Sequence, residues 1–127
     1  MEILELKQNL SFINNKFTNI SIPKHFHEEY SLSLIYDGIH RYENEKNNYN
    51  LNSGIIQVVN PYEFHTTQNS SWAYLNIMPT ATLVNSIAKD ILQNDTINTI
   101  VFKSTTISCS TNDIYRSDHL LNMFILL

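Results

Sequence analysis

Apolar and polar residues alternate along the stretch from residue 25 to residue 36. One face of this stretch carries Tyr30, Leu32, Leu34 and Tyr36, and the other carries His25, His27, Glu29, Ser31, Ser33 and Ile35. Because successive side chains of a strand point to opposite faces, the pattern predicts a strand with one apolar face and one small, polar face. Alternation does not decide which face is turned inward, since a barrel that holds a polar pocket turns its polar face in.

Turn residues divide the rest of this half of the chain into further short segments. The Asp37-Gly38 pair is a hairpin signal, and it predicts that residues 39–43 return as the partner strand. The sequence predicts other turns at residues 44–48, 52–54, 60–61 and 68–71, and strands at residues 49–51, 55–59 and 72–78. Residues 1–24 predict short strands or an N-terminal arm that ends at Pro23. So many short strands without a helix among them favour an antiparallel barrel or sandwich.

The apolar period becomes helical after Pro79. Apolar residues then recur three and four positions apart, at Leu83, Val84, Ile87, Ala88, Ile91 and Leu92. This spacing predicts a helix over about residues 82–93, with Thr80 or Thr82 as its N-cap. Residues 99–107 are rich in β-branched side chains and predict an extended segment.

A second helix is predicted at the C-terminal end, after an N-cap region at residues 111–113. Its apolar stripe consists of Leu120, Leu121, Phe124 and Ile125. An exposed stripe of this kind is typical of an interface with another chain. The alternative is that the helix packs on its own barrel. The sequence ends in apolar residues without a C-cap, which predicts either a truncated chain end or a helix that continues.

Composition narrows the class of protein. The 127 residues, 43% apolar and 16% charged, are typical of one globular domain. A net charge of −4 provides no basic patch, so this segment is not expected to bind nucleic acid by itself. No apolar run reaches the roughly 20 residues that a membrane-spanning helix needs, and no signal peptide is apparent, so we expect a cytoplasmic protein.

Three histidines form the candidate chemical site. His25 and His27 share one strand face, and His65 lies on a later strand that can meet them inside a barrel. Three imidazoles can hold a divalent metal ion, with Glu29 as a fourth ligand, and such an ion is the one candidate cofactor. The alternative is that these histidines bind an effector by hydrogen bonds or stabilise the strand entry.

Two aromatic residues are candidates for the same pocket. Trp72 and Tyr74 alternate with Asn76 on one face of the predicted strand, and their rings can stack on a small molecule. The alternative is that both rings belong to the hydrophobic core.

The spacing of these residues resembles the two cupin signatures. The first is matched by His25, His27 and Gly38, with Ser31 where the signature has glutamate, and the second by Gly54, Pro61, His65 and Asn69. The segments Pro23–Leu32, Gly38–Tyr42, Asn60–Thr66 and Trp72–Tyr74 are more specifically similar to the N-terminal effector-binding domain of AraC-family transcription regulators. Ser31 is one departure from the enzymatic pattern, because it replaces the carboxylate ligand.

The resemblance implies a mainly β fold, a cupin-like antiparallel β-barrel (double-stranded β-helix) followed by C-terminal α-helices. Residues 1–107 would form the effector-binding barrel, including the helix at about 82–93. Residues 108–127 would begin a helical dimerisation or linker region, truncated before a DNA-binding domain. Because such helices pair two subunits in this family, the resemblance implies a homodimer that forms through Leu120, Leu121, Phe124 and Ile125.

The function implied is that of a ligand sensor rather than an enzyme. A small effector would bind in the barrel and control a C-terminal helix-turn-helix domain that is not present in this chain. The ligand-binding residues would be His25, His27, His65, Trp72 and Tyr74. The alternative is a small metal-dependent cupin enzyme, an oxygenase or isomerase, that uses the three histidines to hold iron, manganese or zinc.

Overall fold

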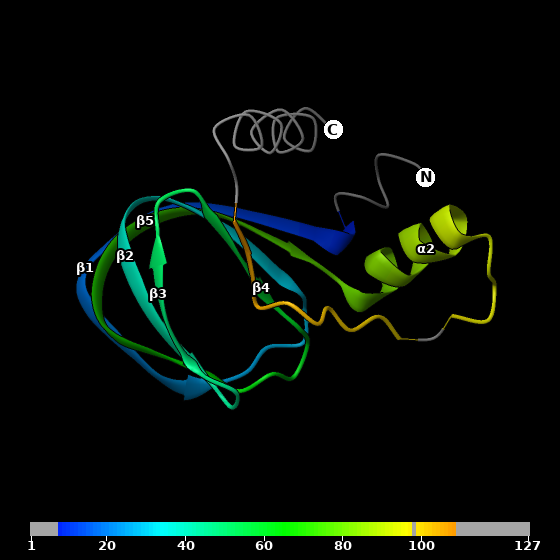
Figure 1. The fold of residues 1–127 in the computed structure, drawn as a ribbon. Helices are drawn as coiled ribbons and strands as arrows, with labels where there is room; N and C mark the ends of the chain where they lie inside the picture. Colours follow the sequence, from blue (N-terminus) through cyan, green and yellow to red (C-terminus); the bar gives the residue numbers. More distant parts are fainter. Residues whose placement is uncertain (1–7, 98, 109–127) are drawn as a thin grey trace.

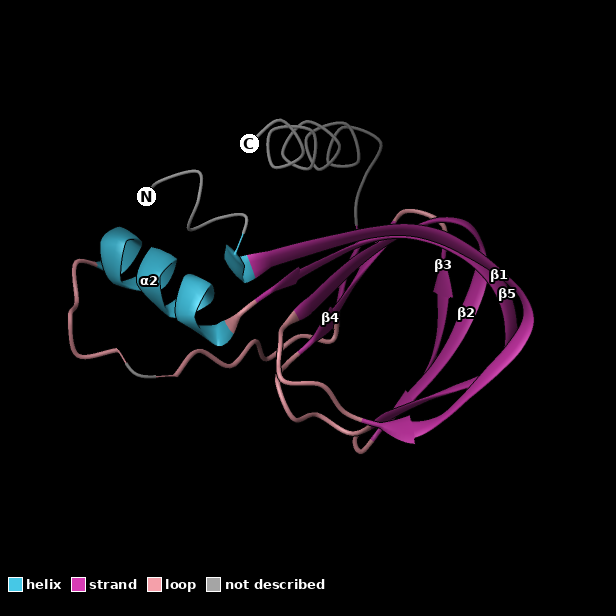
Figure 2. Cartoon of the chain, turned by 180° about the vertical axis from the view of Figure 1, so that it is seen from behind, coloured by secondary structure: helices cyan, strands magenta, loops and turns pink. Residues whose placement is uncertain are grey.

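The computed structural model describes residues 8–97 and 99–108. Its elements are β1 (Leu10–His25), β2 (Ser31–Asn44), β3 (Asn48–Asn52), β4 (Ile55–Val59), β5 (His65–Pro79), α2 (Ala81–Leu92) and β6 (Thr106–Ser108) (Figure 1). The strands form one antiparallel sheet in the order β1-β5-β2-β4-β6, and β3 pairs with β2. Figure 2 shows how the strands curl around an interior, with α2 beyond one end. The prediction of a cupin-like antiparallel barrel is confirmed.

Two predicted turns are wrong. Asp37 and Gly38 lie inside β2, and Gln68 to Ser71 lie inside β5, so neither segment reverses the chain. The two strands pair over most of their length, with one shift of register after Ile35 and another after Ile39. The first shift inserts an extra residue in β2 and the second inserts one in β5. The turn-forming residues therefore mark β-bulges, which need the same unusual backbone conformations as turns.

Each bulge reverses the alternation of its strand. In β2, Ser31 and Ser33 point inward before the bulge, and His40 lines the same interior after it. In β5, Thr67 points inward before the bulge and Trp72 after it. The paired bulges thus keep one continuous inner face across two strands that bend around the barrel.

Gly38 allows the two strands to approach closely at the first bulge. Its backbone has a φ of +75°, and a Cβ atom at this position would lie 2.2 Å from the carbonyl oxygen of Ser71. Only glycine fits both conditions, because a side chain meets a steric penalty at positive φ and here would also collide with backbone.

The N-terminal segment is one long strand rather than several short ones. β1 spans 16 residues, runs past Pro23 to His25, and pairs with β5. Pro23 is tolerated because β1 lies at the edge of the sheet that residues 8–97 and 99–108 form, where a missing N–H breaks no ladder to another described strand.

The other predicted elements agree with the structure more closely. β3, β4 and the predicted helix are present, and the Thr80 hydroxyl caps α2 by accepting a hydrogen bond from the Leu83 N–H at 3.2 Å. The predicted strand at residues 99–107 is reduced to β6. The predicted C-terminal helix with Leu120, Leu121, Phe124 and Ile125 lies outside the described residues. No helix in the described ranges is long and apolar enough to cross a membrane.

Both faces of the start of β2 are buried. The main hydrophobic cluster inside the barrel consists of Ile35, Tyr42, Leu51, Val59 and Trp72. On the outer face, the ring of Tyr30 packs edge-on against Phe102 at 5.6 Å, and its hydroxyl donates to the carbonyl of Ile100. The segment after α2 therefore covers the apolar face, so the small polar face is the one turned inward.

We expect Gly38→Ala to lower the free energy of unfolding by at least about 2 kcal/mol, since it combines positive-φ strain with a backbone clash. Urea unfolding followed by circular dichroism measures this loss. Gly54→Ala is the matched control, because Gly54 also has a positive φ, of +92°. Equal losses in the two variants would show that the close approach to Ser71 adds nothing.

Candidate functional site

A cavity of about 190 Å³ lies inside the barrel. Its wall includes all five residues predicted to bind a ligand, namely His25, His27, His65, Trp72 and Tyr74. They come from β1, from the loop before β2, and from β5. The structure thus places these five candidates around one internal cavity. The small polar face of residues 25–36, whose direction the sequence left open, is turned toward this cavity.

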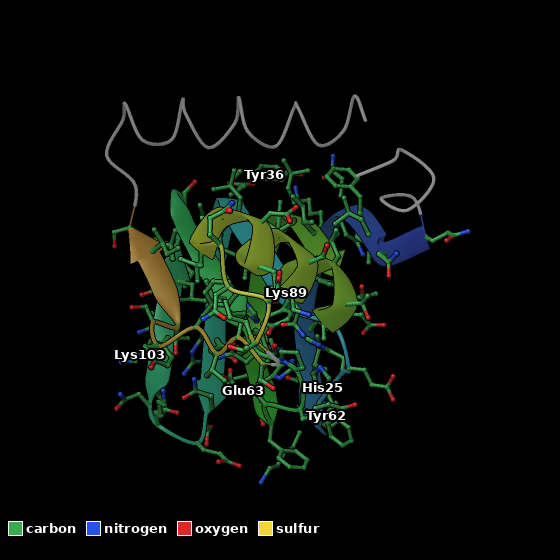
Figure 3. All side chains as sticks on the ribbon, turned by 90° about the vertical axis from the view of Figure 1, so that its right-hand side faces the viewer. His25, Tyr36, Tyr62, Glu63, Lys89 and Lys103 are labelled. Atoms are coloured by element: carbon green, nitrogen blue, oxygen red, sulfur yellow. The ribbon has the colours of Figure 1, made fainter. Side chains whose placement is uncertain are left out.

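The three predicted histidines form a cluster at one end of the barrel. His25 ends β1 and His65 begins β5, and the two are register partners in the sheet. The ring centroids of His25 and His65 are 4.1 Å apart, and those of His27 and His65 are 5.0 Å apart. Figure 3 shows His25 and Tyr62 toward the lower end of the molecule, whereas Tyr36 lies toward the upper end.

Backbone carbonyls orient all three rings. The Nδ1 atom of His25 lies 2.7 Å from the Pro23 oxygen, that of His27 lies 3.0 Å from the Glu29 oxygen, and that of His65 lies 2.8 Å from the Glu63 oxygen. A carbonyl oxygen only accepts hydrogen bonds, so each Nδ1 must carry the proton and donate it. The neutral rings therefore each keep a lone pair on Nε2.

Aromatic contacts hold the loops that carry this cluster. Phe26 and Phe64, next in sequence to the histidines, pack against each other with ring centroids 5.2 Å apart. Tyr62 adopts a φ of +63°, and its N–H donates to the carbonyl of His27 at 2.8 Å. The loop before β2 and the turn before β5 are thus joined directly, which fixes the position of His27 relative to His65.

The carboxylates near the cluster are not part of it. Glu29 does not belong to the group of described residues that could share a metal ion, which consists of His25, His27 and His65. The carboxylate of Glu63 accepts a hydrogen bond from the Tyr42 hydroxyl at 2.9 Å. Among the described residues, the cluster is therefore made of imidazoles alone.

Trp72 and Tyr74 line the cavity and also pack in or against the hydrophobic cluster, so the pocket and core interpretations both apply to them. Trp72 is 4% exposed and belongs to the hydrophobic cluster, yet it also lines the cavity. Its ring lies 4.9 Å from that of Phe17 and 6.0 Å from that of Tyr74, between centroids. Burial raises the pKa of the Tyr74 hydroxyl, which therefore stays protonated and remains a hydrogen-bond donor.

His40 is a cavity residue that the sequence analysis did not select. It is 6% exposed, its ring stacks on Trp72 at 4.2 Å, and its Nε2 lies 2.8 Å from the Thr67 hydroxyl. Its Nδ1 is buried without a hydrogen-bond partner. The bulge at Gly38 brings His40 inward, so only recognition of the Asp37-Gly38 pair as a bulge could have revealed it.

A row of uncharged polar side chains completes the cavity wall. Ser33 of β2 pairs with Gln57 of β4 and with Asn76 of β5, so the three lie side by side on the inner face. Asn76 donates to the hydroxyl of Ser31 at 2.9 Å, while its Oδ1 is buried without a partner. These amides and hydroxyls can orient a polar ligand by hydrogen bonds.

We expect the free energy of unfolding to fall as the pH is lowered through the range between the two pKa values of His40. Burial lowers its pKa from 6.5 to about 4 in the folded protein, so the unfolded chain binds the proton first. The stabilisation is complete above pH 6.5 and is lost as the pH falls toward 4. Urea unfolding at a series of pH values, with EDTA present to remove metal ions, measures the profile.

His40→Phe keeps an aromatic ring against Trp72 and removes the titrating group, so its profile should be flatter. It should not be flat, because burial also lowers the pKa of His65 to about 4. A profile as steep as that of the parent protein would show that His40 is not protonated on unfolding in this range.

Comparisons with known proteins identify similar sequences and folds. A family model described as the AraC-like ligand binding domain matches residues 8–127. A search of curated proteins found no match.

Among solved structures, ToxT from Vibrio cholerae O395 bound to (E)-4-(8-methylnaphthalen-1-yl)but-3-enoic acid aligns at 17% identity with a TM-score of 0.58. The alignment covers 91% of this chain and 48% of ToxT. A second ToxT crystal structure aligns at 16% identity with a TM-score of 0.57, over 88% of this chain and 47% of ToxT. This chain thus spans about half the length of ToxT.

KdgF from Halomonas sp. aligns at 18% identity with a TM-score of 0.48, over 60% of this chain and 75% of that protein. At such identities, the likeness to ToxT shows a shared fold, and the KdgF likeness is too distant to support an argument.

Proposed function

The chain belongs to the family of AraC-like ligand-binding domains, and we propose that it senses a small effector in its barrel for a transcription regulator. The observation that carries this proposal is the internal cavity of about 190 Å³. Its wall combines aromatic rings with a few uncharged polar groups, which is the usual composition of a small-molecule site. A binding role, rather than catalysis, is the one that the family supports.

The cavity is placed where a ligand would influence several elements. Its wall is made of residues from β1, β2, β4 and β5, including Phe17, Ser33, Gln57 and Trp72. A ligand that contacts all four strands favours the conformation in which they enclose it, and so shifts the population of barrel conformations. This shift is the signal that we propose is transmitted to the rest of the regulator.

DNA recognition would then belong to a helix-turn-helix domain outside this chain. The net charge of −4 is unsuited to binding phosphates, and the chain spans about half the length of ToxT. Control of that domain by the effector is part of the proposal, as is homodimerisation through Leu120, Leu121, Phe124 and Ile125.

We expect a screen of small metabolites to find a compound that raises the melting temperature and changes the fluorescence of Trp72, the single tryptophan of the chain. Ser33→Leu should weaken the binding of that compound by about tenfold or more, because a larger side chain enters the cavity at a cost of about 1–3 kcal/mol. Fluorescence titration of both proteins measures the ratio.

Ser53→Leu is the matched control, since Ser53 lies exposed in the turn between β3 and β4. It should bind the compound as tightly as the parent protein. A compound that binds Ser33→Leu equally well would not occupy the cavity, and a screen without any binder would argue against a sensor.

We expect the protein to be a dimer in solution and Leu121→Glu to shift it to monomer, because a charge placed in an apolar contact is strongly unfavourable. Light scattering coupled to size-exclusion chromatography gives the mass of each form. Leu121→Met, which preserves an apolar side chain of similar size, should remain dimeric. A parent protein that is monomeric at high micromolar concentration would contradict this part of the proposal.

A further inference from the structure

We propose that the effector is uncharged at neutral pH and that it donates a hydrogen bond to the Oδ1 atom of Asn76. This inference rests on the proposed function, because it names the chemical class of the effector that the cavity would hold. Two features of the cavity support it: a buried acceptor without a donor, and the lack of charge on the described residues around that acceptor.

The side-chain amide of Asn76 has one half engaged and one half available. Its Nδ2 donates to the hydroxyl of Ser31 at 2.9 Å, which orients the group. Its Oδ1 is buried and has no hydrogen-bond partner in the part of the chain that the structure describes. An amide oxygen only accepts hydrogen bonds, and a buried acceptor without a donor is unfavourable. A ligand with an N–H or O–H group at this position would remove that cost.

The neighbours of Asn76 on the cavity wall are mostly apolar. Its register partners are Ile13 of β1 and Ser33 of β2, and Tyr74 and Met78 lie two positions before and after it on β5, on the same face. All of them line the cavity. The donor group of the effector would therefore be attached to an apolar body, such as a ring.

The ring of Trp72 already has partners within the protein. His40 stacks on it with ring centroids 4.2 Å apart and planes at 5°, and Phe17 packs against it at 4.9 Å. A ligand that stacked on Trp72 would compete with these contacts. We therefore place the apolar body of the effector beside Ile13 and Met78 instead.

The described wall provides no countercharge for an ion at Asn76. None of its residues is an aspartate, glutamate, lysine or arginine. Burial lowers the pKa of His40 and that of His65 to about 4, and it raises the pKa of the Tyr74 hydroxyl. These three side chains are therefore uncharged at neutral pH.

The other two histidines of the wall lie far along the sheet from Asn76. His25 and His27 surround His65, where the ladder of β1 and β5 ends, whereas Ile13 pairs with Asn76 toward the opposite end. Between these points the two strands curve around the interior (Figure 2). An ionised group at Asn76 would thus lose its hydration without gaining a countercharge, which is strongly unfavourable.

Four compounds of nearly the same shape test the chemical class. Benzamide is uncharged and has an N–H donor, acetophenone has a methyl group in place of that donor, benzoate is an anion, and benzamidine is a cation. We expect benzamide to bind the parent protein most tightly, and the other three to bind at least about tenfold more weakly. The fluorescence of Trp72 and the melting temperature measure binding. Weaker binding of benzamide to Ser33→Leu would locate the compound in the cavity.

Asn76→Asp should change the preference for charge. The Ser31 hydroxyl can donate to one carboxylate oxygen, and the other oxygen brings a negative charge to the position of Oδ1. We expect benzamidine to bind this variant at least about tenfold more tightly than it binds the parent protein. Asn50→Asp is the matched control, because Asn50 is exposed on β3 and is not part of the cavity wall. It should leave the affinities for all four compounds unchanged.

Asn76→Leu is a second variant, with a side chain of similar volume and no acceptor. In this variant benzamide should lose its advantage over acetophenone. Circular dichroism establishes whether each variant is folded, and the comparison of the four compounds on the parent protein depends on neither variant.

The inference would be refuted if acetophenone, benzoate or benzamidine bound the parent protein as tightly as benzamide, although such binding would still support a sensor. It would also be refuted if folded Asn76→Asp bound benzamidine no better than the parent protein does. Failure of all four compounds to bind the parent protein would refute it as well, and the metabolite screen would then decide separately whether the cavity binds an effector at all.

Discussion

The pairing of β2 with β5 is the constraint on which the rest of the molecule depends. The two strands are the longest antiparallel partners in the interior of the sheet, and each carries one bulge that bends it and reverses its alternation. Without the bulges, two straight ladders could not keep His40 and Ser33 on one inner face. The close approach of Gly38 to the Ser71 carbonyl is the point at which this geometry leaves no room for a side chain.

The histidine cluster is a product of that sheet rather than of any one motif. His25 and His65 face each other because β1 continues as far as the first residue of β5, and His27 is added by a loop tied to the Tyr62 N–H. The rings take their orientation from main-chain carbonyls, which do not depend on side-chain identity. The backbone therefore determines both where the rings lie and which nitrogen of each is left for binding.

Local patterns in the sequence were sufficient for some features and not for others. The Thr80 cap and the helix after it were predicted, because capping and helical periodicity are local. The alternation around His25 placed His25 and His27 on one face, and both line the cavity. Asp37-Gly38 was mistaken for a hairpin because turns and bulges demand the same backbone freedom, and only pairing with a distant strand separates them. His40 was missed for that reason. The direction of the polar face depended on Phe102 covering Tyr30, a contact between residues far apart in the chain.

Among the strands that the structure describes, β1 pairs with β5 alone, and its last residue supplies one wall of the histidine cluster. Strand ends with a single partner fray more often than strands held on both sides. The residence time of anything held between His25 and His65 would therefore be set by the opening rate of this strand end, as well as by the strength of the contacts themselves. A bound molecule would in turn slow that fraying. Slower amide hydrogen exchange at the end of β1 would therefore report that the site is occupied.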